Sequence, residues 1–475
     1  MIERGLHLRP RRGALAAAAA ASVLAGCMNL APRYERPPAP VAPNFPVETM
    51  PASAPGGPAA ADIEWQRFFA DPRLQRLIEL ALQNNRDLRI AVLNIEQARA
   101  LYQVRRADEL PTVGAGAIVQ RQPGSNGKLA NSYSVGLAVT SYELDFFGRV
   151  RNLSQAALAQ YLATAEARKT AQISLIASVA NAYLALLADD ELVRVTRQAL
   201  GTREDSLRLT KLKFDYGASS ELDYRQAESL LEGARATLAQ TLRQRTLDED
   251  ALVLLLGQPL PPELPAPLAL NGAQVPTDLP AGLPSDLLER RPDIRAAEQQ
   301  LIGAHANIGA ARAAFFPRIA LTGNFGSASA QLSGLFKSGS FAFTGTGQLL
   351  ETIFDAGRNQ ANLDVAKVNR EIAVAQYEKA IQSAFREVAD ALGGRATLGE
   401  QLRAQLAQAN AEEVRFKLSD LRYRNGAASY LEVLDAQRSL FLAQQAVVQV
   451  RAAQVQNLVT LYRVLGGGWK EDAPG

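Results

Sequence analysis

Apolar residues recur three and four positions apart along most of the chain, and this spacing predicts α-helices with one apolar face. Residues 72–109 and 286–315 show it in segments rich in Ala, Leu, Arg and Gln. Residues 150–215 and 359–424 show it too and contain no proline. At about 1.5 Å per residue, each of these two predicts a helix of roughly 100 Å. Apolar positions in the first recur as in a coiled-coil seam: Ile173, Ile176, Ala180 and Leu187.

A glycine follows each long segment, Gly217 after the first and Gly426 after the second. Glycine readily takes the left-handed conformation that ends helices. Helical patterning resumes beyond both glycines. The sequence therefore predicts two helical hairpins, 150–256 and 359–465, with these glycines at their tips.

Between the short and the long helical segments, apolar residues alternate with small or polar ones, which is the period of a β-strand. Two β-hairpins are expected, at about 110–143 and about 316–352. The apolar set includes Tyr133, Val135, Leu137, Val139, Phe341 and Phe343. The opposite face carries Gly, Ser, Thr and Asn, as strands between lipid and a water-filled lumen do. An amphipathic sheet of a soluble protein is the alternative interpretation.

The two halves of the chain repeat each other at a nearly constant offset of 206 to 209 residues. The matched strings are DLR at 87–89 with DIR at 293–295, FFGR ending at Arg149 with DAGR ending at Arg358, and Gly217-Ala218 with Gly426-Ala427. Glycine and proline positions are kept, so we infer an internal duplication. The expected domains are a leader, 1–26; a tether, 27–62; a first repeat, 63–265; a linker, 266–285; a second repeat, 286–466; and a tail, 467–475.

The N-terminal residues resemble a bacterial lipoprotein signal. Arginines precede an apolar stretch, 14–25, that is too short to span a bilayer, and it ends in Leu-Ala-Gly-Cys27. Cys27, the chain's single cysteine, is expected to be acylated, with palmitate for example, and to become the first residue after cleavage. Met28 in place of Asp favours the outer membrane. The proline-rich residues 31–58 predict an extended, weakly ordered tether.

Composition bears on two further questions, whether the chain binds nucleic acid and how it would cross a membrane. The net charge is +3, from 51 basic and 48 acidic residues, which predicts no nucleic-acid partner. No later apolar run of about twenty residues is evident, so the membrane would be crossed by β-strands. Four strands are too few to close a barrel, and chains must pool them. Two chains would give eight strands and three would give twelve, and the pattern does not choose between them.

Enzymatic chemistry has little support. His305 is the one histidine outside the leader, so neither a zinc cluster nor a histidine triad can be assembled within one chain. Phosphate loops and dinucleotide fingerprints are absent from the sequence. We expect no catalytic residue, cofactor or metal site.

Three long strings resemble the TolC-type outer membrane efflux family, in particular its lipoprotein branch. They are DLLERRPDIRAAEQQLIGAHANIGAARAAFFPRIALTG from Asp286, YRNGAASYLEVLDAQRSLF from Tyr423, and ELDFFGR from Glu143. The resemblance implies a mixed α and β homotrimer, with a twelve-strand barrel in the outer membrane of a Gram-negative bacterium and a coiled-coil barrel of long helices in the periplasm. It implies a passive conduit that exports small molecules, docked to a periplasmic adaptor and an RND-type inner-membrane transporter.

The resemblance also implies a periplasmic gate at Leu431, Asp435 and Arg438. These residues are spaced to share one helical face, and a trimer makes each a ring of three. Leucines in a ring exclude water, while converging carboxylates attract cations and raise one another's proton affinity. Arg438 would lock the closed state through an inter-helix pair. The positions that match in the first repeat are Leu222, Gln226 and Ser229, so only the second carries charge. An ordinary solvated face is the alternative.

Gly217 and Gly426 mark the tips where an adaptor would dock, and a plain helix-ending role explains both equally well. Two further functions remain open from sequence. One is a duct for type I protein secretion, which the same fold serves. The other is a non-conducting coiled-coil lipoprotein that spaces the envelope layers.

Overall fold

The computed structural model describes residues 29–46, 60–123, 129–270, 275–276, 279 and 284–469. Cys27, the leader and the end of the tail lie outside these residues. The chain divides into two compact units. The first comprises 1–38, 94–165 and 296–377, and the second comprises 39–93, 166–295 and 378–475.

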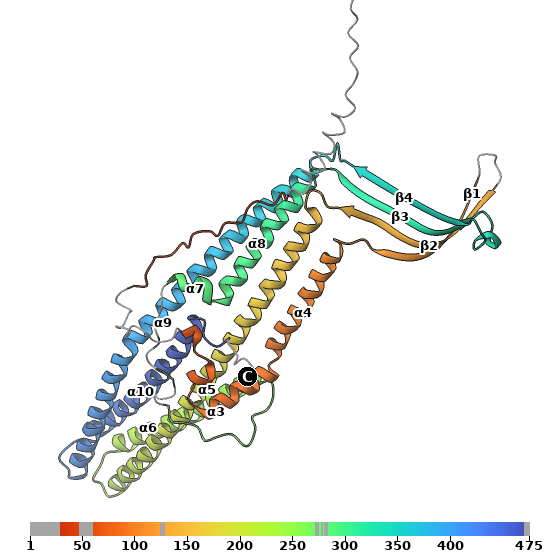
Figure 1. Cartoon of the computed structure of the whole chain (residues 1–475). Coiled ribbons are helices and arrows are strands. Elements are labelled where there is room, and N and C mark those ends of the chain that lie inside the picture. Colours follow the sequence, from red (N-terminus) through yellow and green to blue (C-terminus); the bar gives the residue numbers. More distant parts are fainter. Residues whose placement is uncertain are drawn as a thin grey trace, which may run out of the picture. The chain divides into compact units, whose positions relative to one another are not determined.

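Helices make up most of the described chain (Figure 1). They are α2 (Trp65–Phe68), α3 (Pro72–Asn84), α4 (Arg86–Ala107), α5 (Arg149–Asp215), α6 (Glu221–Leu256), α7 (Pro284–Arg290), α8 (Pro292–Ala313), α9 (Arg358–Arg424) and α10 (Tyr430–Val464), with 3-10 turns at Ala60–Asp62 and Leu332–Gly334. The strands are β1 (Val113–Pro123), β2 (Leu129–Leu144), β3 (Arg318–Ser329) and β4 (Phe341–Leu350).

The duplication is visible element by element. Helices α5 and α9 each contain 67 residues, and their bounds are offset by the same 209 residues that relate the sequence strings. Helices α4 and α8 each contain 22 residues and are offset by 206. The short helical segments expected to be continuous are each divided in two. The breaks fall at Asn85, which has an extended backbone, and at Arg291, which precedes a proline.

In each repeat, the end of the returning helix contacts the residue just before a 22-residue helix. These helix ends belong to α6 and α10, and the 22-residue helices are α4 and α8. In the first, Asn85 donates to the Leu255 carbonyl at 2.9 Å. In the second, Arg291 donates to the Val464 carbonyl at 3.1 Å. Asn85 and Arg291 are equivalent positions, and so are the two carbonyls. The same backbone approach is therefore held by an amide in one repeat and a guanidinium in the other.

A glycine completes each closure. Gly257 has φ +69°, and a Cβ there would lie 2.4 Å from the Asn84 carbonyl oxygen. Gly466 has φ +86°, and a Cβ there would lie 2.8 Å from the Arg290 carbonyl oxygen. Both positions need the left-handed conformation and the missing side chain at once. These glycine contacts and the two hydrogen bonds to helix-end carbonyls are called here the closure contacts.

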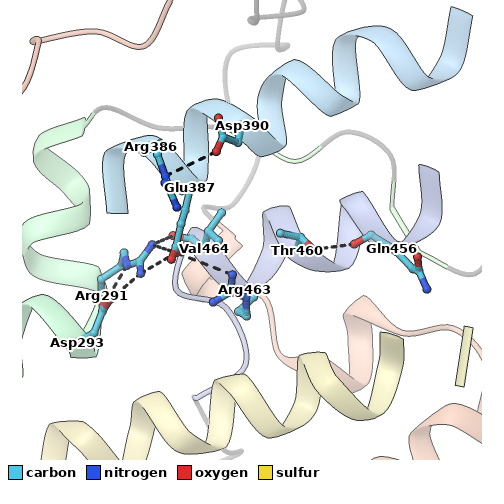
Figure 2. Close-up of polar contacts among 9 residues, drawn as sticks. All are labelled: Arg291, Asp293, Arg386, Glu387, Asp390, Gln456, Thr460, Arg463 and Val464. Atoms are coloured by element: carbon cyan, nitrogen blue, oxygen red, sulfur yellow. Dashed lines mark hydrogen bonds and ion pairs between the residues drawn. The ribbon is translucent and has the colours of Figure 1, made fainter. Parts of the chain in front are cut away.

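The second closure carries an additional ion-pair cluster (Figure 2). Buried Arg291 makes two hydrogen bonds to Asp293, at 3.0 and 2.6 Å, and both its terminal nitrogens lie 3.1 Å from Glu387 of α9. Arg463 approaches Glu387 at 3.9 Å. A guanidinium fork matches carboxylates in this geometry, so the buried charge is compensated.

Aromatic packing forms the centre of the second unit. Phe68 and Tyr462 are both buried, and their rings stack with centroids 3.9 Å apart. The Tyr462 hydroxyl donates to the Ile63 carbonyl at 2.6 Å. Asp71 accepts the first backbone N–H groups of α3 and also the Tyr183 hydroxyl at 2.8 Å, which joins the helix start to α5.

Helix α5 departs from one sequence expectation. Among the described residues, it is the one helix containing an 18-residue stretch apolar enough to cross a membrane. No such run was expected after the leader from the sequence. The structure buries 67% of that stretch, as in the core helix of a folded domain.

The tether is irregular, as expected, but its described part is not loosely held. Tyr34 donates to Glu298 of α8 at 2.8 Å, and Arg36 forms two hydrogen bonds to the same carboxylate at 2.8 and 3.1 Å. Tyr34 also packs edge-on against His305, with ring centroids 5.5 Å apart. Specific contacts therefore replace the weak order that proline content alone suggested.

The closure contacts predict an unequal response to glycine substitution. Gly466→Ala combines a positive φ with a backbone clash and should lower the free energy of unfolding by about 2–4 kcal/mol. Gly426→Ala is the matched control, since its φ is +73° but nothing lies within 4 Å of the added Cβ. It should cost about 1 kcal/mol. Denaturant unfolding of the trimer in detergent measures both, and equal losses would contradict the clash.

Candidate functional site

The strands form a four-stranded antiparallel sheet in the order β1-β2-β3-β4. Its register places apolar side chains in rows across one face, for example Ala115, Leu137, Phe325 and Phe343. The adjacent row lies on the other face and holds Gly114, Ala138, Asn324 and Thr344. Phe325 is 59% exposed and Phe343 is 74% exposed in the single chain. A sheet with large aromatics exposed on one face and small polar residues on the other fits between lipid and water.

A β-bulge in β2 keeps the apolar side chains on one face of the sheet as far as the end of the strand at Leu144. The register shifts between Val139 and Tyr142, so one extra residue is accommodated against β3. Ser141 within it has φ +54°. The apolar phase of β2 therefore changes from odd to even positions, and Tyr142 pairs with Leu321. Simple alternation in the sequence did not reveal this change.

Strands β1 and β4 each pair with one neighbour within the chain. Unpaired backbone N–H and C=O groups are not tolerated against hydrocarbon, because no water is present to satisfy them. Both edges must pair with other chains when the sheet lies in a membrane. The sheet is therefore one segment of a shared wall.

Both helical hairpins turn through the same hydrogen-bonded motif. Gly217 donates to the Phe214 carbonyl at 2.9 Å, and Ala218 donates to the Lys213 carbonyl at 2.7 Å. Gly426 and Ala427 repeat these bonds at 3.1 and 2.8 Å. This is the Schellman ending, in which a left-handed glycine lets the last carbonyls of a helix be satisfied. The two predicted tip glycines thus occupy equivalent turns.

Helix α10 begins just after the second tip and buries one face. Tyr430 and Val433 pack in a cluster with Tyr423 of α9 and Ala227 of α6. Leu431 is 60% exposed in the single chain, and Asp435 and Arg438 are also exposed. The three residues predicted for a gate therefore share the face of α10 that its own chain leaves uncovered.

The structure gives Asp435 a partner that was not expected from the sequence. Arg415 of α9 forms an ion pair with Asp435 and a second one with Glu412 at 3.1 Å. These carboxylates raise the pKa of Arg415. Within the described chain, Arg438 makes no ion pair. The available signal was distance from the turn, because Arg415 and Asp435 lie ten residues before and ten residues after Asn425, and residues equally far from a turn on two antiparallel helices face each other.

The two hairpin tips differ in how their returning helices start. Ser220 caps α6 in a capping box with Asp223, whose backbone N–H donates to the Ser220 hydroxyl at 3.1 Å. Ser429 makes no such side-chain bond at the start of α10. The corresponding acid, Glu432, instead pairs with Arg422 across the hairpin at 3.1 Å. The second tip is therefore held by cross-helix charges and the first by a local cap.

Comparisons with known proteins agree with this geometry. The family model described as "Outer membrane efflux protein" matches twice, at residues 77–258 and 283–467. The chain is 46% identical over 468 residues to the toluene efflux pump outer membrane protein TtgC and the antibiotic efflux pump outer membrane protein ArpC, both of Pseudomonas putida, covering 96% of each chain. The crystal structure of the open state of the Neisseria gonorrhoeae MtrE outer membrane channel matches with TM-score 0.85 and 42% identity, covering 93% of this chain and 99% of that one.

A sheet segment that only other chains can complete, joined in sequence to two long helical hairpins, defines an outer-membrane channel subunit. The chain belongs to the outer membrane efflux protein family. The expected homotrimer, with four strands from each chain, is confirmed, and so is its place as the outer-membrane channel of an efflux system. The family is one of channels and not of enzymes.

The two faces of the sheet predict opposite effects of one substitution at adjacent positions. Phe325→Arg places a charge against lipid and should weaken folding into bilayers by about 2–4 kcal/mol if the residue lies near the midplane. Asn324→Arg on the other face should leave assembly intact and shift ion selectivity toward anions. Folding into lipid vesicles and reversal potentials in planar bilayers measure the two effects. The assignment of faces fails if Asn324→Arg is the variant that does not assemble.

Proposed function

We propose that the periplasmic entrance of the trimeric conduit is gated by rings of Leu431, Asp435 and Arg438. The observation that supports this is the uncovered face of α10 beside a hairpin tip, on which all three residues lie. Threefold symmetry brings three copies of each toward the axis. The leucine ring would exclude water, and the carboxylate ring would select cations.

The Arg415–Asp435 pair would hold the resting position of α10 against α9. Both side chains are exposed, and exposed ion pairs contribute little free energy. Such a contact can be exchanged at low cost when the helices move. The equivalent positions in the first repeat are Ser206 and Gln226, which form no ion pair with each other. The second hairpin, with its uncapped helix start, would therefore move most on opening.

Removing the carboxylate tests the gate. Asp435→Ala should increase leakage of closed trimers and reduce their preference for cations, because the ring loses its negative charge and its bond to Arg415. Gln226→Ala, at the equivalent position of the first repeat, is the control and should behave as wild type. Single-trimer conductance in planar bilayers measures both properties. Unchanged leakage and unchanged cation preference in Asp435→Ala would remove the proposed role.

We also propose that the hairpin tips bind a periplasmic adaptor, which joins the channel to an RND-type inner-membrane transporter. The names of the relatives, which are outer membrane proteins of efflux pumps, support such an assembly. The first tip also exposes two leucines, Leu212 and Leu222, and Leu421 is exposed at the matching position of the second tip. Exposed apolar side chains clustered at one place are typical of a protein-binding surface.

A bulky residue at a tip tests docking. Gly217→Trp adds a side chain where nothing lies within 4 Å in the chain itself, although the positive φ makes the turn less stable. It should reduce cross-linking to the adaptor severalfold while trimers still form. Gly233→Trp, at an equally open position within α6, is a control for bulk. Loss of trimers in Gly217→Trp would instead assign the glycine a structural role alone.

The cargo is proposed to be small molecules of low polarity, including drugs and solvents. Relatives named for efflux of toluene and of antibiotics support this class over exported proteins. No catalytic step is assigned to the chain, and selection among cargoes would lie with the transporter. Acylation of Cys27 remains a prediction from the sequence, with outer-membrane lipid as the partner of the acyl group.

A further inference from the structure

A cavity of about 360 Å³ opens between α5, α9 and α10 within the second unit. Its volume falls within the range of small-molecule sites. Side chains of both repeats line it, and they include apolar and charged groups. The lining residues used below are Ala199, Arg203, Phe416, Lys417, Gln437 and Phe441.

Arg203 of α5 is 6% exposed. Among the described residues, its side chain makes one hydrogen bond, to the Leu230 carbonyl at 3.2 Å, and no ion pair. The guanidinium carbon lies 5.0 Å from the centroid of the Phe441 ring. A guanidinium has five N–H donors and stays charged, so burying it with a single carbonyl partner is costly.

The surroundings of Arg203 disfavour its charge. Burial lowers the pKa of Arg203, Tyr430 raises it, and the neighbouring Arg438 guanidinium lowers it further. Glu413 also lines the cavity, and its carboxylate forms an ion pair with Lys417 at 2.6 Å. An anion entering the cavity would therefore meet a buried cation whose charge no described carboxylate compensates.

Gln437 of α10 supplies a second incomplete polar group. The residue is 7% exposed, and its amide oxygen has no hydrogen-bond partner among the described residues. Amide orientation is interchangeable by rotation, so either end of this group can face a ligand. Two side chains more than nine-tenths buried, from α5 and α10, thus leave polar atoms unsatisfied at one cavity.

We propose that this cavity binds an organic carboxylate with an apolar body. The carboxylate would accept hydrogen bonds from Arg203 and from the Gln437 amide, and the apolar part would pack against Phe416 and Phe441. A bare inorganic anion would leave these aromatic walls empty, and a cation would be repelled by Arg203. Because the ligand contacts α5 of the first repeat and α9 and α10 of the second, it would join the two hairpins.

The test uses the intact trimer in detergent and the probe 4-fluorobenzoate, followed by fluorine NMR line broadening. The matched neutral probe is 4-fluorobenzamide, which has nearly the same shape and no charge. Detergent alone provides the blank. Wild-type protein should bind the acid at least about tenfold more tightly than the amide, because a hydrogen bond between charged groups is stronger than a neutral one.

Three variants locate the site. Arg203→Met should weaken binding of the acid at least about tenfold. Arg194→Met, which removes an exposed, paired cation of the same helix outside the cavity, should change it by less than about threefold. Ala199→Trp should abolish binding by filling the cavity. Trimer formation and helical content are checked for each.

Three results would overturn the proposal. They are no binding of the acid to wild type, equal binding of acid and amide, or full binding by folded Arg203→Met. If Arg203→Met does not fold, Ala199→Trp and the acid–amide comparison still decide the question. None of these measurements requires conduction, so the result is independent of the proposed gate.

Discussion

Strands β1 and β4 each have one hydrogen-bonded neighbour within the chain, and hydrocarbon offers their free edges no other partner. The backbone N–H and C=O groups on these two edges need hydrogen-bond partners from other chains, and this need constrains the rest of the molecule. It requires several chains around one axis, and threefold symmetry then makes every axial side chain a ring. In the proposed gate, Asp435, which would be an ordinary solvated acid on a monomer, would be one of three converging carboxylates. Function therefore resides in the assembly more than in any site of one chain.

The two repeats share a backbone plan and differ in charge. Equivalent closure contacts hold both, yet Asn85 in the first corresponds to Arg291 in the second, which recruits Asp293 and Glu387. The tips also differ in charge. The first is held by a local cap at Ser220, and the second by an ion pair across the hairpin between Arg422 and Glu432. The turns and carbonyl contacts that set the geometry are thus the same in both repeats, while the second repeat carries additional ion pairs at its closure contacts and at its tip.

The cavity beside Arg203 lies where the two repeats meet within the second unit. Its walls come from α5, α9 and α10, so its shape depends on how the hairpins pack. A buried cation without a carboxylate partner is unusual in a stable core, and its presence at this junction suggests a function beyond packing. The ion pairs at the tip and the cation in the cavity are separate features, although both involve α10.

Sequence by itself determined the features set by neighbours along the chain. Periodicity gave the helices and strands, constant spacing gave the duplication, and Gly217 and Gly426 marked turns, because each depends on local backbone geometry. The tertiary structure decided which distant residues meet. It paired Arg415 with Asp435, joined the tether to Glu298, shifted the phase of β2 near Ser141, and left Arg203 beside a cavity. Contacts between elements depend on how whole helices and strands pack, and the spacing of residues within one element does not determine that packing.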